Sequence, residues 1–207
     1  MSGPPLDEEA ARLEALWAGS FGDDYAIRNV EANDARRAFW DELLSSIDVH
    51  NALEVGCNIG GNLMWIAPHM APGATYGVDV NRTALGRVHE CLPGVNAILS
   101  PARVLPFRDR WFDLVFTVGV LIHQPEESLS LVMNEMVRCS KRYVLCAEYF
   151  AEPDIEVPYR GQRGALFKRN YRCRFEQNFP ELRLERTGFL GRDQGWDDVT
   201  WWLFRRI

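Results

Sequence analysis

A short apolar run that ends in a glycine-bearing turn constrains the fold of this chain more than any other segment. It begins at Ala52 and continues as Leu-Glu-Val-Gly-Cys-Asn-Ile-Gly-Gly-Asn, ending at Asn62. A helix-compatible segment, residues 63–67, follows it. A strand that ends in such a turn just before a helix lets main-chain N–H groups approach a ligand closely. The segment therefore predicts a ligand site at the end of a strand.

An acid near the end of the next apolar run supports this prediction. Residues 74–80 are Ala-Thr-Tyr-Gly-Val-Asp-Val, and the acid, Asp79, lies 19 residues after Gly60. At this distance a doubly wound fold places the carboxylate that binds ribose hydroxyls. The turn and the acid together predict a site for a nucleoside cofactor. The alternative is a turn that serves only packing, with Asp79 capping the next helix.

The turn lacks a glycine that dinucleotide sites use. A G-x-G-x-x-G fingerprint would fall on Gly56, Asn58 and Gly61, so Asn58 replaces the middle glycine that lets the main chain meet a pyrophosphate. Glu54 is unsuited to a phosphate and suits a cationic ligand. The sequence from Leu53 to Gly60 resembles the first motif of class I S-adenosylmethionine (SAM) methyltransferases, which implies SAM as the cofactor. NAD or FAD is the alternative.

Strands and helices are predicted to alternate from residue 51. We expect strands at 51–56, 75–79, 95–99, 112–118 and 142–148, and helices at 61–67, 82–91 and 126–139. This pattern predicts an α/β fold with a doubly wound, mostly parallel sheet that has helices on both faces. Two final strands, about 182–190 and 199–205, complete a seven-stranded Rossmann-like sheet. Such an ending is typical of class I methyltransferases and not of dehydrogenases.

The length of 207 residues predicts a single methyltransferase domain over residues 1–207. Two amphipathic helices are expected near its start, one from Leu6 to Trp17 and one from Arg36 to Ile47, with a segment without periodicity between them. We expect residues 1–48 to form a helical lid over a SAM-binding core of residues 49–207. A less regular stretch, about 151–180, is predicted to be an insert at the acceptor site.

Composition narrows the class of partner. The formal net charge of −6 argues against general nucleic-acid binding. No apolar run approaches the roughly 20 residues of a membrane helix, and no signal segment opens the chain, so we expect a cytoplasmic protein without a membrane partner. The five cysteines are widely spaced and the four histidines show no ligand spacing, which favours reduced thiols and no metal site.

Several further motifs recur together in one family. They are Phe21-Gly22-Asp23-Asp24-Tyr25 with Arg28-Asn29, residues 117–123, Pro158-Tyr159-Arg160-Gly161 with residues 166–169, and residues 197–202. With the glycine turn they closely resemble the pseudaminic acid biosynthesis-associated methylases over about residues 20–205. The resemblance implies a SAM-dependent methyltransferase of a biosynthetic pathway for a sugar acid, a nucleotide sugar or a natural product.

The motifs and the strand ends predict which residues contact the cofactor. Asp79 is expected to bind the ribose, Glu54 to orient the turn or the cofactor ammonium, and Arg28 to pair with the cofactor carboxylate. No acid follows the third strand, so we expect the Ala102 main chain and the Ser100 hydroxyl to meet the adenine. The predicted set is Tyr25, Arg28, Glu54, Gly56, Cys57, Asn58, Gly60, Asp79, Val80, Ser100, Ala102 and Val118.

Few residues are candidates for catalysis, because methyl transfer is a displacement in which positioning supplies much of the rate. His123 follows the fourth strand and would accept a proton near neutral pH, or else would only brace its loop. Tyr149 and Glu148, at the end of the fifth strand, are comparable candidates.

Basic residues in the predicted insert favour a small, anionic acceptor. Tyr159, Arg160, Lys168 and Arg169 would suit a carboxylate or a phosphate, with methylation on oxygen or nitrogen. The alternative for this stretch is a solvated basic face. For the whole chain, the competing functions are a small NAD-dependent oxidoreductase and a catalytically silent SAM-binding scaffold.

Overall fold

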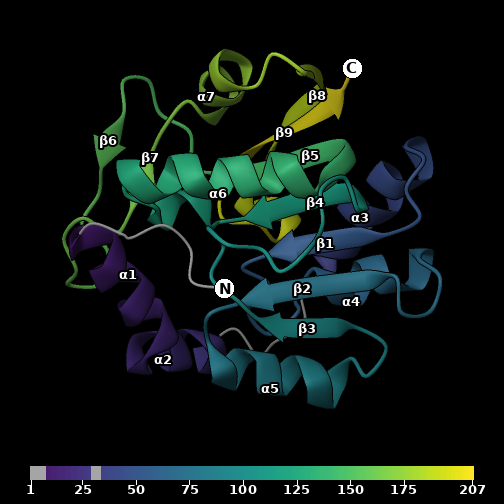
Figure 1. Cartoon of the computed structure of the whole chain (residues 1–207). Coiled ribbons are helices and arrows are strands. Elements are labelled where there is room, and N and C mark those ends of the chain that lie inside the picture. The colour runs from purple at the N-terminus through teal and green to yellow at the C-terminus, as the bar shows by residue number, and fades with distance from the viewer. Residues whose placement is uncertain (1–7, 29–33) are drawn as a thin grey trace.

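The computed structural model describes residues 8–28 and 34–207, and its centre is a seven-stranded sheet (Figure 1). The strands lie in the order β3-β2-β1-β4-β5-β9-β8. The first five are parallel, and β9 lies antiparallel between β5 and β8. Their bounds are β1 (Ala52–Val55), β2 (Thr75–Asp79), β3 (Asn96–Leu99), β4 (Phe112–Val118), β5 (Ser140–Glu148), β8 (Leu182–Leu190) and β9 (Val199–Arg206). The predicted doubly wound, mostly parallel α/β fold is confirmed.

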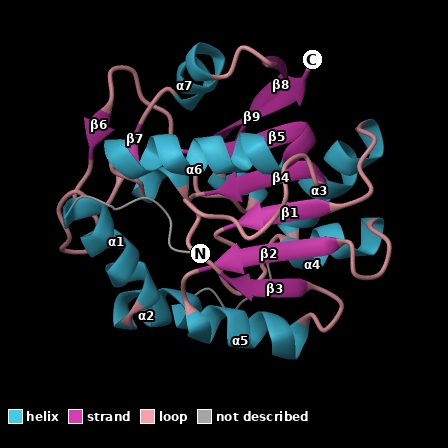
Figure 2. Ribbon diagram, viewed as in Figure 1, coloured by secondary structure: helices cyan, strands magenta, loops and turns pink. Residues whose placement is uncertain are grey.

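Helices cover both faces of this sheet, as Figure 2 shows. Each face has its own cluster of buried side chains. One cluster joins the sheet to α6 (Glu126–Cys139) and α7 (Tyr171–Asn178), and the other joins it to α3 (Ala35–Ser46), α4 (Leu63–Ile66) and α5 (Arg82–Cys91). All four residues of β1 are buried, because a central parallel strand is covered on both sides.

Two helices precede this core, α1 (Glu8–Ala18) and α2 (Ser20–Arg28), and we refer to them together as the cap. Figure 1 shows the cap at the edge of the sheet toward which the arrowheads of β2 and β3 point. The sequence predicted no regular structure between residues 21 and 29, yet α2 extends to Arg28. Its buried positions are the small residues Gly22 and Ala26, so no apolar stripe is visible in the sequence. Leu6 and Asn29 lie outside the described residues.

The less regular stretch after β5 contains a two-stranded sheet, β6 (Ile155–Glu156) with β7 (Phe167–Lys168), followed by α7. The helix was not predicted because only two of its residues, Tyr171 and Phe175, are buried among charged neighbours. None of the helices in the described part of the chain has the length and apolar character that a bilayer-crossing segment needs.

The packing around β2 predicts opposite effects for two glycine substitutions. A Cβ at Gly77 would lie 2.7 Å from Cys57 Sγ and 2.7 Å from Leu63 Cδ1, whereas a Cβ at Gly86 in α5 meets nothing within 4 Å. We expect Gly77→Ala to lower the free energy of unfolding by about 1–3 kcal/mol. Gly86→Ala should raise it by about 0.5–1 kcal/mol, because alanine favours the helix. Urea unfolding followed by circular dichroism measures both, and a neutral Gly77→Ala would contradict the packing.

Candidate active site

A cavity of about 370 Å³ lies at the carboxyl ends of the parallel strands. The chain leaves β1 for β2 and β3 on one side and then crosses to β4 on the other side, so the strand order reverses next to β1. Ligands of doubly wound folds bind at this kind of crevice. The turns after the first four strands line the cavity, together with the cap, the start of α3 and the loop between β8 and β9.

The turn after β1 has the left-handed backbone that its sequence predicts. Gly56, Asn58 and Gly60 all have positive φ, at 75°, 46° and 82°. A Cβ on Gly56 would lie 2.5 Å from Val120 Cγ2, so glycine lets the loop after β4 approach. A Cβ on Gly60 would lie 2.8 Å from Leu92 Cδ1. Gly60 therefore allows close packing against α5 and does not line the cavity.

Asp79 joins this turn to the turn after β2. Its Oδ2 accepts the Asn58 N–H at 2.8 Å, and its Oδ1 accepts the Asn81 N–H at 2.9 Å. Burial raises the pKa of Asp79, while these backbone donors lower it. Asp79 does not cap α5, because Asn81 Oδ1 accepts the Ala84 N–H there. The Val80 N–H is a third backbone donor to this carboxylate, which lines the cavity and has acceptor capacity left for a hydroxyl donor.

Glu54 is a buried carboxyl at the end of β1 that lines the same cavity. Its Oε1 accepts a hydrogen bond of 2.6 Å from Asn62 Nδ2, whereas its buried Oε2 has no partner. Burial raises the pKa of Glu54 to about 8. The group is therefore largely protonated at neutral pH, and a cation placed beside Oε2 would ionise it.

Arg36, which the sequence analysis did not select, faces the same corner of the cavity. Its Nη1 lies 3.4 Å from Asn62 Oδ1, and its guanidinium stands 4.8 Å from the centre of the Trp196 ring. Its Nε is buried without a partner, and no ion pair with Arg36 occurs among residues 8–28 and 34–207. Asn62 therefore contacts both the Glu54 carboxyl and the Arg36 guanidinium, and each of these two groups has a buried polar atom without a partner. This pair suits a ligand that carries an ammonium and a carboxylate.

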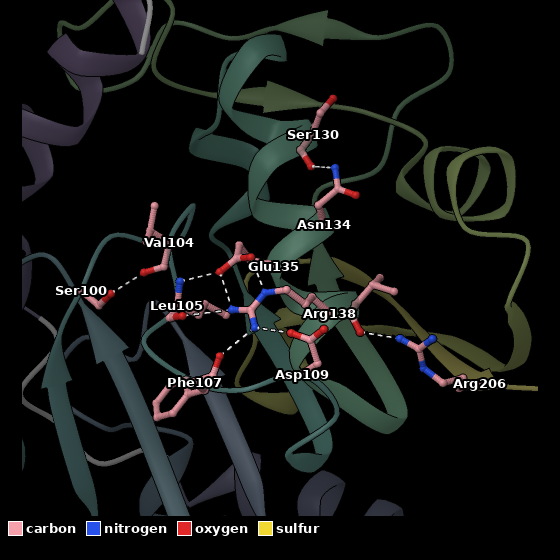
Figure 3. Close-up of polar contacts among 11 residues, drawn as sticks. Ser100, Val104, Leu105, Phe107, Asp109, Ser130, Asn134, Glu135, Arg138 and Arg206 are labelled. Atoms are coloured by element: carbon pink, nitrogen blue, oxygen red, sulfur yellow. Dashed lines mark hydrogen bonds and ion pairs between the residues drawn. The ribbon is translucent and has the colours of Figure 1, made fainter. Parts of the chain in front are cut away.

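The loop after β3 forms the other end of the cavity, and α6 fixes it (Figure 3). The Arg138 guanidinium donates to the carbonyls of Leu105 and Phe107, while Glu135 accepts the Leu105 N–H at 2.6 Å. Ser100 Oγ donates to Val104 O at 2.7 Å, so the hydroxyl has only acceptor capacity left for a ligand. The contact of Ser100 with the adenine therefore stays a prediction, with Ser100 Oγ as the acceptor of that hydrogen bond.

Glu148 holds the loop after β4 from inside the sheet. Its carboxylate accepts four hydrogen bonds of 3.1–3.2 Å, from the Thr117 hydroxyl and from the backbone N–H groups of Val120, Leu121 and Ile122. Burial raises the pKa of Glu148 to about 7, although the four hydrogen bonds lower it. With its oxygens engaged, Glu148 positions this loop and is not a free base.

His123 ends this loop in the 3-10 helix η2 (Leu121–His123) and lines the cavity. Its Nδ1 donates to Ala165 O at 2.5 Å, which leaves Nε2 as the acceptor atom. The imidazole packs 4.6 Å from the Trp17 ring and 5.1 Å from the Tyr159 ring. Burial lowers the pKa of His123 to about 4. The ring is therefore neutral at pH 7 and a weak base.

The remaining predicted catalytic and acceptor residues lie around the cavity, not on its wall. Burial raises the pKa of Tyr149 to about 12, so its phenol stays protonated at neutral pH and is not a base. Lys168 Nζ lies 5.6 Å from the Tyr149 ring, and the Arg160 guanidinium lies 5.8 Å from the Tyr159 ring.

Arg169 does not face the acceptor end as expected. Its side chain is only 5% exposed, and Nη1 donates to Gln124 O at 2.9 Å. Its Nε lies within 4 Å of Glu126 and of Asp154. These contacts occupy the guanidinium with the protein itself. Arg169 therefore braces the loop that ends at Gln124.

Comparisons with known proteins agree with this geometry. Residues 52–142 match a family model described as a methyltransferase domain. The match runs from β1 to β5 and includes the glycine turn, Asp79 and His123.

Curated relatives extend beyond this chain. Methyltransferase GfsG of Streptomyces halstedii is 30% identical over 115 residues, which are 51% of this chain and 40% of that protein. The 24-methylenesterol C-methyltransferase 2 of Arabidopsis thaliana is 26% identical over 167 residues, 72% of this chain and 45% of the relative. The chain therefore spans less than half the length of these two relatives.

Solved structures share the fold over nearly the whole chain. Magnesium protoporphyrin IX methyltransferase from Synechocystis PCC 6803, solved with SAM, has a TM-score of 0.71 at 14% identity, with 100% of both chains covered. The 1,6-didemethyltoxoflavin-N1-methyltransferase of Burkholderia thailandensis, solved with S-adenosylhomocysteine, has a TM-score of 0.74 at 15% identity, covering 100% of this chain and 93% of that one. The predicted class I methyltransferase fold is confirmed, and the narrower resemblance to the pseudaminic acid-associated methylases stays a prediction.

The fold brings most of the predicted cofactor residues to one cavity. Ten of the twelve line it, and the exceptions are Gly60 and the exposed Arg28. Sequence reasoning missed Trp17, Arg36 and Asn81. Asn81 follows Asp79 closely and starts a helix, so its turn position was a usable signal. Trp17 and Arg36 lie in α1 and α3, and no short sequence pattern indicates how these helices pack on the sheet.

The buried carboxyl of Glu54 predicts a pH-dependent stability. Its pKa is about 8 in the folded protein against a reference of 4.5, so its contribution to folding is lost as pH rises from about 4.5 through 8. We expect the stability advantage of Glu54→Gln over wild type to grow by on the order of 3 kcal/mol between pH 5 and pH 8. Urea unfolding at both pH values measures it. The exposed control Glu127→Gln should show no such trend, and a pH-independent advantage of Glu54→Gln would contradict the burial argument.

Proposed function

We propose that this chain is a SAM-dependent methyltransferase that methylates an oxygen or nitrogen of a small acceptor. The observation that carries the proposal is the corner of the cavity where Glu54 Oε2 and Arg36 Nε are buried without partners. Such atoms normally find a partner, because an unsatisfied buried polar group costs about 1–3 kcal/mol. An α-amino-acid group would supply a partner for both.

The residues present fit SAM better than a dinucleotide. Asp79 would hold the ribose hydroxyls, Glu54 the ammonium and Arg36 the carboxylate. The sequence predicts Arg28 for the carboxylate, but Arg28 is exposed and does not line the cavity. Ala102 and Leu13 offer apolar surface at the other end, where adenine would lie. A pyrophosphate at the turn would instead meet Asn58 and Glu54. SAM supplies an electrophilic methyl group when bound, and these side chains bind and orient.

An anionic acceptor would suit the cations near the cavity. Arg160 and Lys168 take part in no ion pair within the described ranges, and they lie over Tyr159 and Tyr149. We therefore retain a carboxylate or phosphate on the acceptor, with Tyr159 beside it. A sugar acid, a nucleotide sugar or a natural-product intermediate has this chemistry. His123 Nε2 and the Tyr149 hydroxyl would orient the acceptor atom by hydrogen bonds.

Calorimetric titration of the protein with SAM, S-adenosylhomocysteine and NAD tests the proposed cofactor. We expect binding of the first two and none of NAD. Binding of NAD alone would favour the oxidoreductase. Binding of SAM without turnover of any acceptor in a panel of sugar acids, nucleotide sugars and aromatic carboxylates would favour the silent scaffold.

The assignment of Arg36 predicts a selective loss of affinity. Arg36→Gln should weaken S-adenosylhomocysteine by about 1.5–3 kcal/mol, because one charged hydrogen bond is lost. It should leave 5′-methylthioadenosine unaffected, since that ligand has the nucleoside but no amino-acid group. Calorimetry measures both affinities. The exposed neighbour Arg37, in the variant Arg37→Gln, is the control. An equal loss of affinity for the two ligands would show that Arg36 does not bind the carboxylate of the cofactor.

The acceptor assignment predicts a different pattern. Once an acceptor is found, Arg160→Ala or Lys168→Ala should lower kcat/KM by the equivalent of about 1.5–3 kcal/mol. The affinity for S-adenosylhomocysteine should stay unchanged in both variants. Arg183→Ala on the exposed side of β8 is the control. Normal turnover by both variants, or a cationic acceptor, would make the basic stretch a solvated face.

A further inference from the structure

Asn81 uses its whole side chain to join three parts of the molecule. Its Oδ1 caps α5 by accepting the Ala84 N–H at 2.8 Å. Its Nδ2 donates to Trp17 O at 3.2 Å and to Asp23 Oδ1 at 2.9 Å. Both acceptors belong to the cap. Asn81 is buried, lines the cavity and follows Asp79 by two residues.

The backbone of Asn81 completes a chain of contacts from the cavity to the cap. Its N–H donates to Asp79 Oδ1, the carboxylate to which we assign the ribose. The same residue therefore has its backbone on the ribose-binding acid and its side chain on the cap. The Asp23 carboxylate is further held by Thr83 and Asn81, which lower its pKa.

Gly22 makes this arrangement possible. A Cβ at Gly22 would lie 1.9 Å from Trp17 O and 2.8 Å from Asn81 Nδ2. Only glycine lets α2 pass so close to the asparagine amide. This is a physical reason for the glycine in the Phe21–Tyr25 motif.

Two further polar contacts of the cap lie away from the ribose. Glu14 pairs with Arg103 at 2.9 Å beside the loop after β3, and Arg12 donates to Arg163 O at 2.9 Å. Neither contact touches Asp79 or its turn. Asn81 thus connects the ribose-binding carboxylate directly to the cap.

We propose that Asn81 is a positioning residue that couples binding of the ribose at Asp79 to closure of the cap over the cofactor. This inference rests on the proposed function. A ribose held by Asp79 restricts the turn that presents Asn81, and the fixed amide then orders Trp17 and Asp23. Ordering of this kind makes ligand binding and cap closure favour one another.

Hydrogen exchange of residues 8–28 tests the coupling, with adenosine and 2′,3′-dideoxyadenosine as matched probes. Each nucleoside is added to saturation, as determined by calorimetry. Adenosine should slow exchange in the cap of the wild-type protein, whereas the dideoxy compound, which lacks the ribose hydroxyls, should not. A purely structural role for Asn81 would not distinguish the two nucleosides.

The variants Asn81→Asp and Asn81→Ser isolate the contact, because both keep an oxygen that can cap α5 while they lack the amide donor. In both, adenosine should protect the turns at 54–62 and 79–81 but not the cap, and S-adenosylhomocysteine should bind about 5- to 100-fold more weakly. Arg12→Gln removes a cap contact distant from the ribose. It should leave the difference between the two nucleosides intact.

Two results would overturn the inference alone. One is wild-type protection of the cap in Asn81→Asp and Asn81→Ser, and the other is equal cap protection by adenosine and its dideoxy analogue. Failure of the wild-type protein to bind S-adenosylhomocysteine or adenosine would instead overturn the proposed function, and this inference with it.

Discussion

The geometry of the cavity depends on the carboxylate of Asp79. One side chain accepts N–H bonds from Asn58 after β1 and from Asn81 after β2, so it sets the spacing between the two turns. A buried carboxylate without donors would cost several kcal/mol, and the backbone supplies these donors without any side-chain ordering. The acid that we expect to bind the ribose is thus fixed before the ligand arrives. Such preorganisation lowers the entropic cost of binding.

The same cavity contains polar atoms for which the folded chain supplies no partner. Three of the five unpartnered buried side-chain atoms in the described ranges lie on its lining residues, at Trp17 Nε1, Arg36 Nε and Glu54 Oε2. Each lowers stability, since its water shell is lost without compensation. A ligand with complementary atoms recovers that free energy on binding. The trade of stability for affinity is a general property of functional sites.

The sequence predicted those parts of the site whose position depends on short stretches of neighbouring residues. The alternation of apolar runs located the strands, and the spacing from Gly60 to Asp79 located the acid, because the turn geometry and the strand length fix both. Arg36 and Trp17 reach the cavity only through the packing of α1 and α3 on the sheet, for which no short-range pattern exists. Arg28 and Arg169 were chosen for their charge, but exposure and neighbouring carboxylates decide where a guanidinium points.

The loop after β4 shows how this fold separates cofactor binding from acceptor chemistry. Four hydrogen bonds to Glu148 fix the backbone that leads to His123, and Ala165 O fixes the imidazole itself. A displacement at a methyl group gains more from such alignment than from a strong base, which agrees with a histidine whose pKa is about 4. The residues that we propose for the acceptor, Tyr159 and Lys168, come late in the chain, in a stretch that holds only two short strands and a helix. Their position depends on tertiary packing, whereas the turns at Gly56 and Asp79 follow directly from strand ends that the sequence marks. That difference explains why the sequence indicates the cofactor far more sharply than the acceptor.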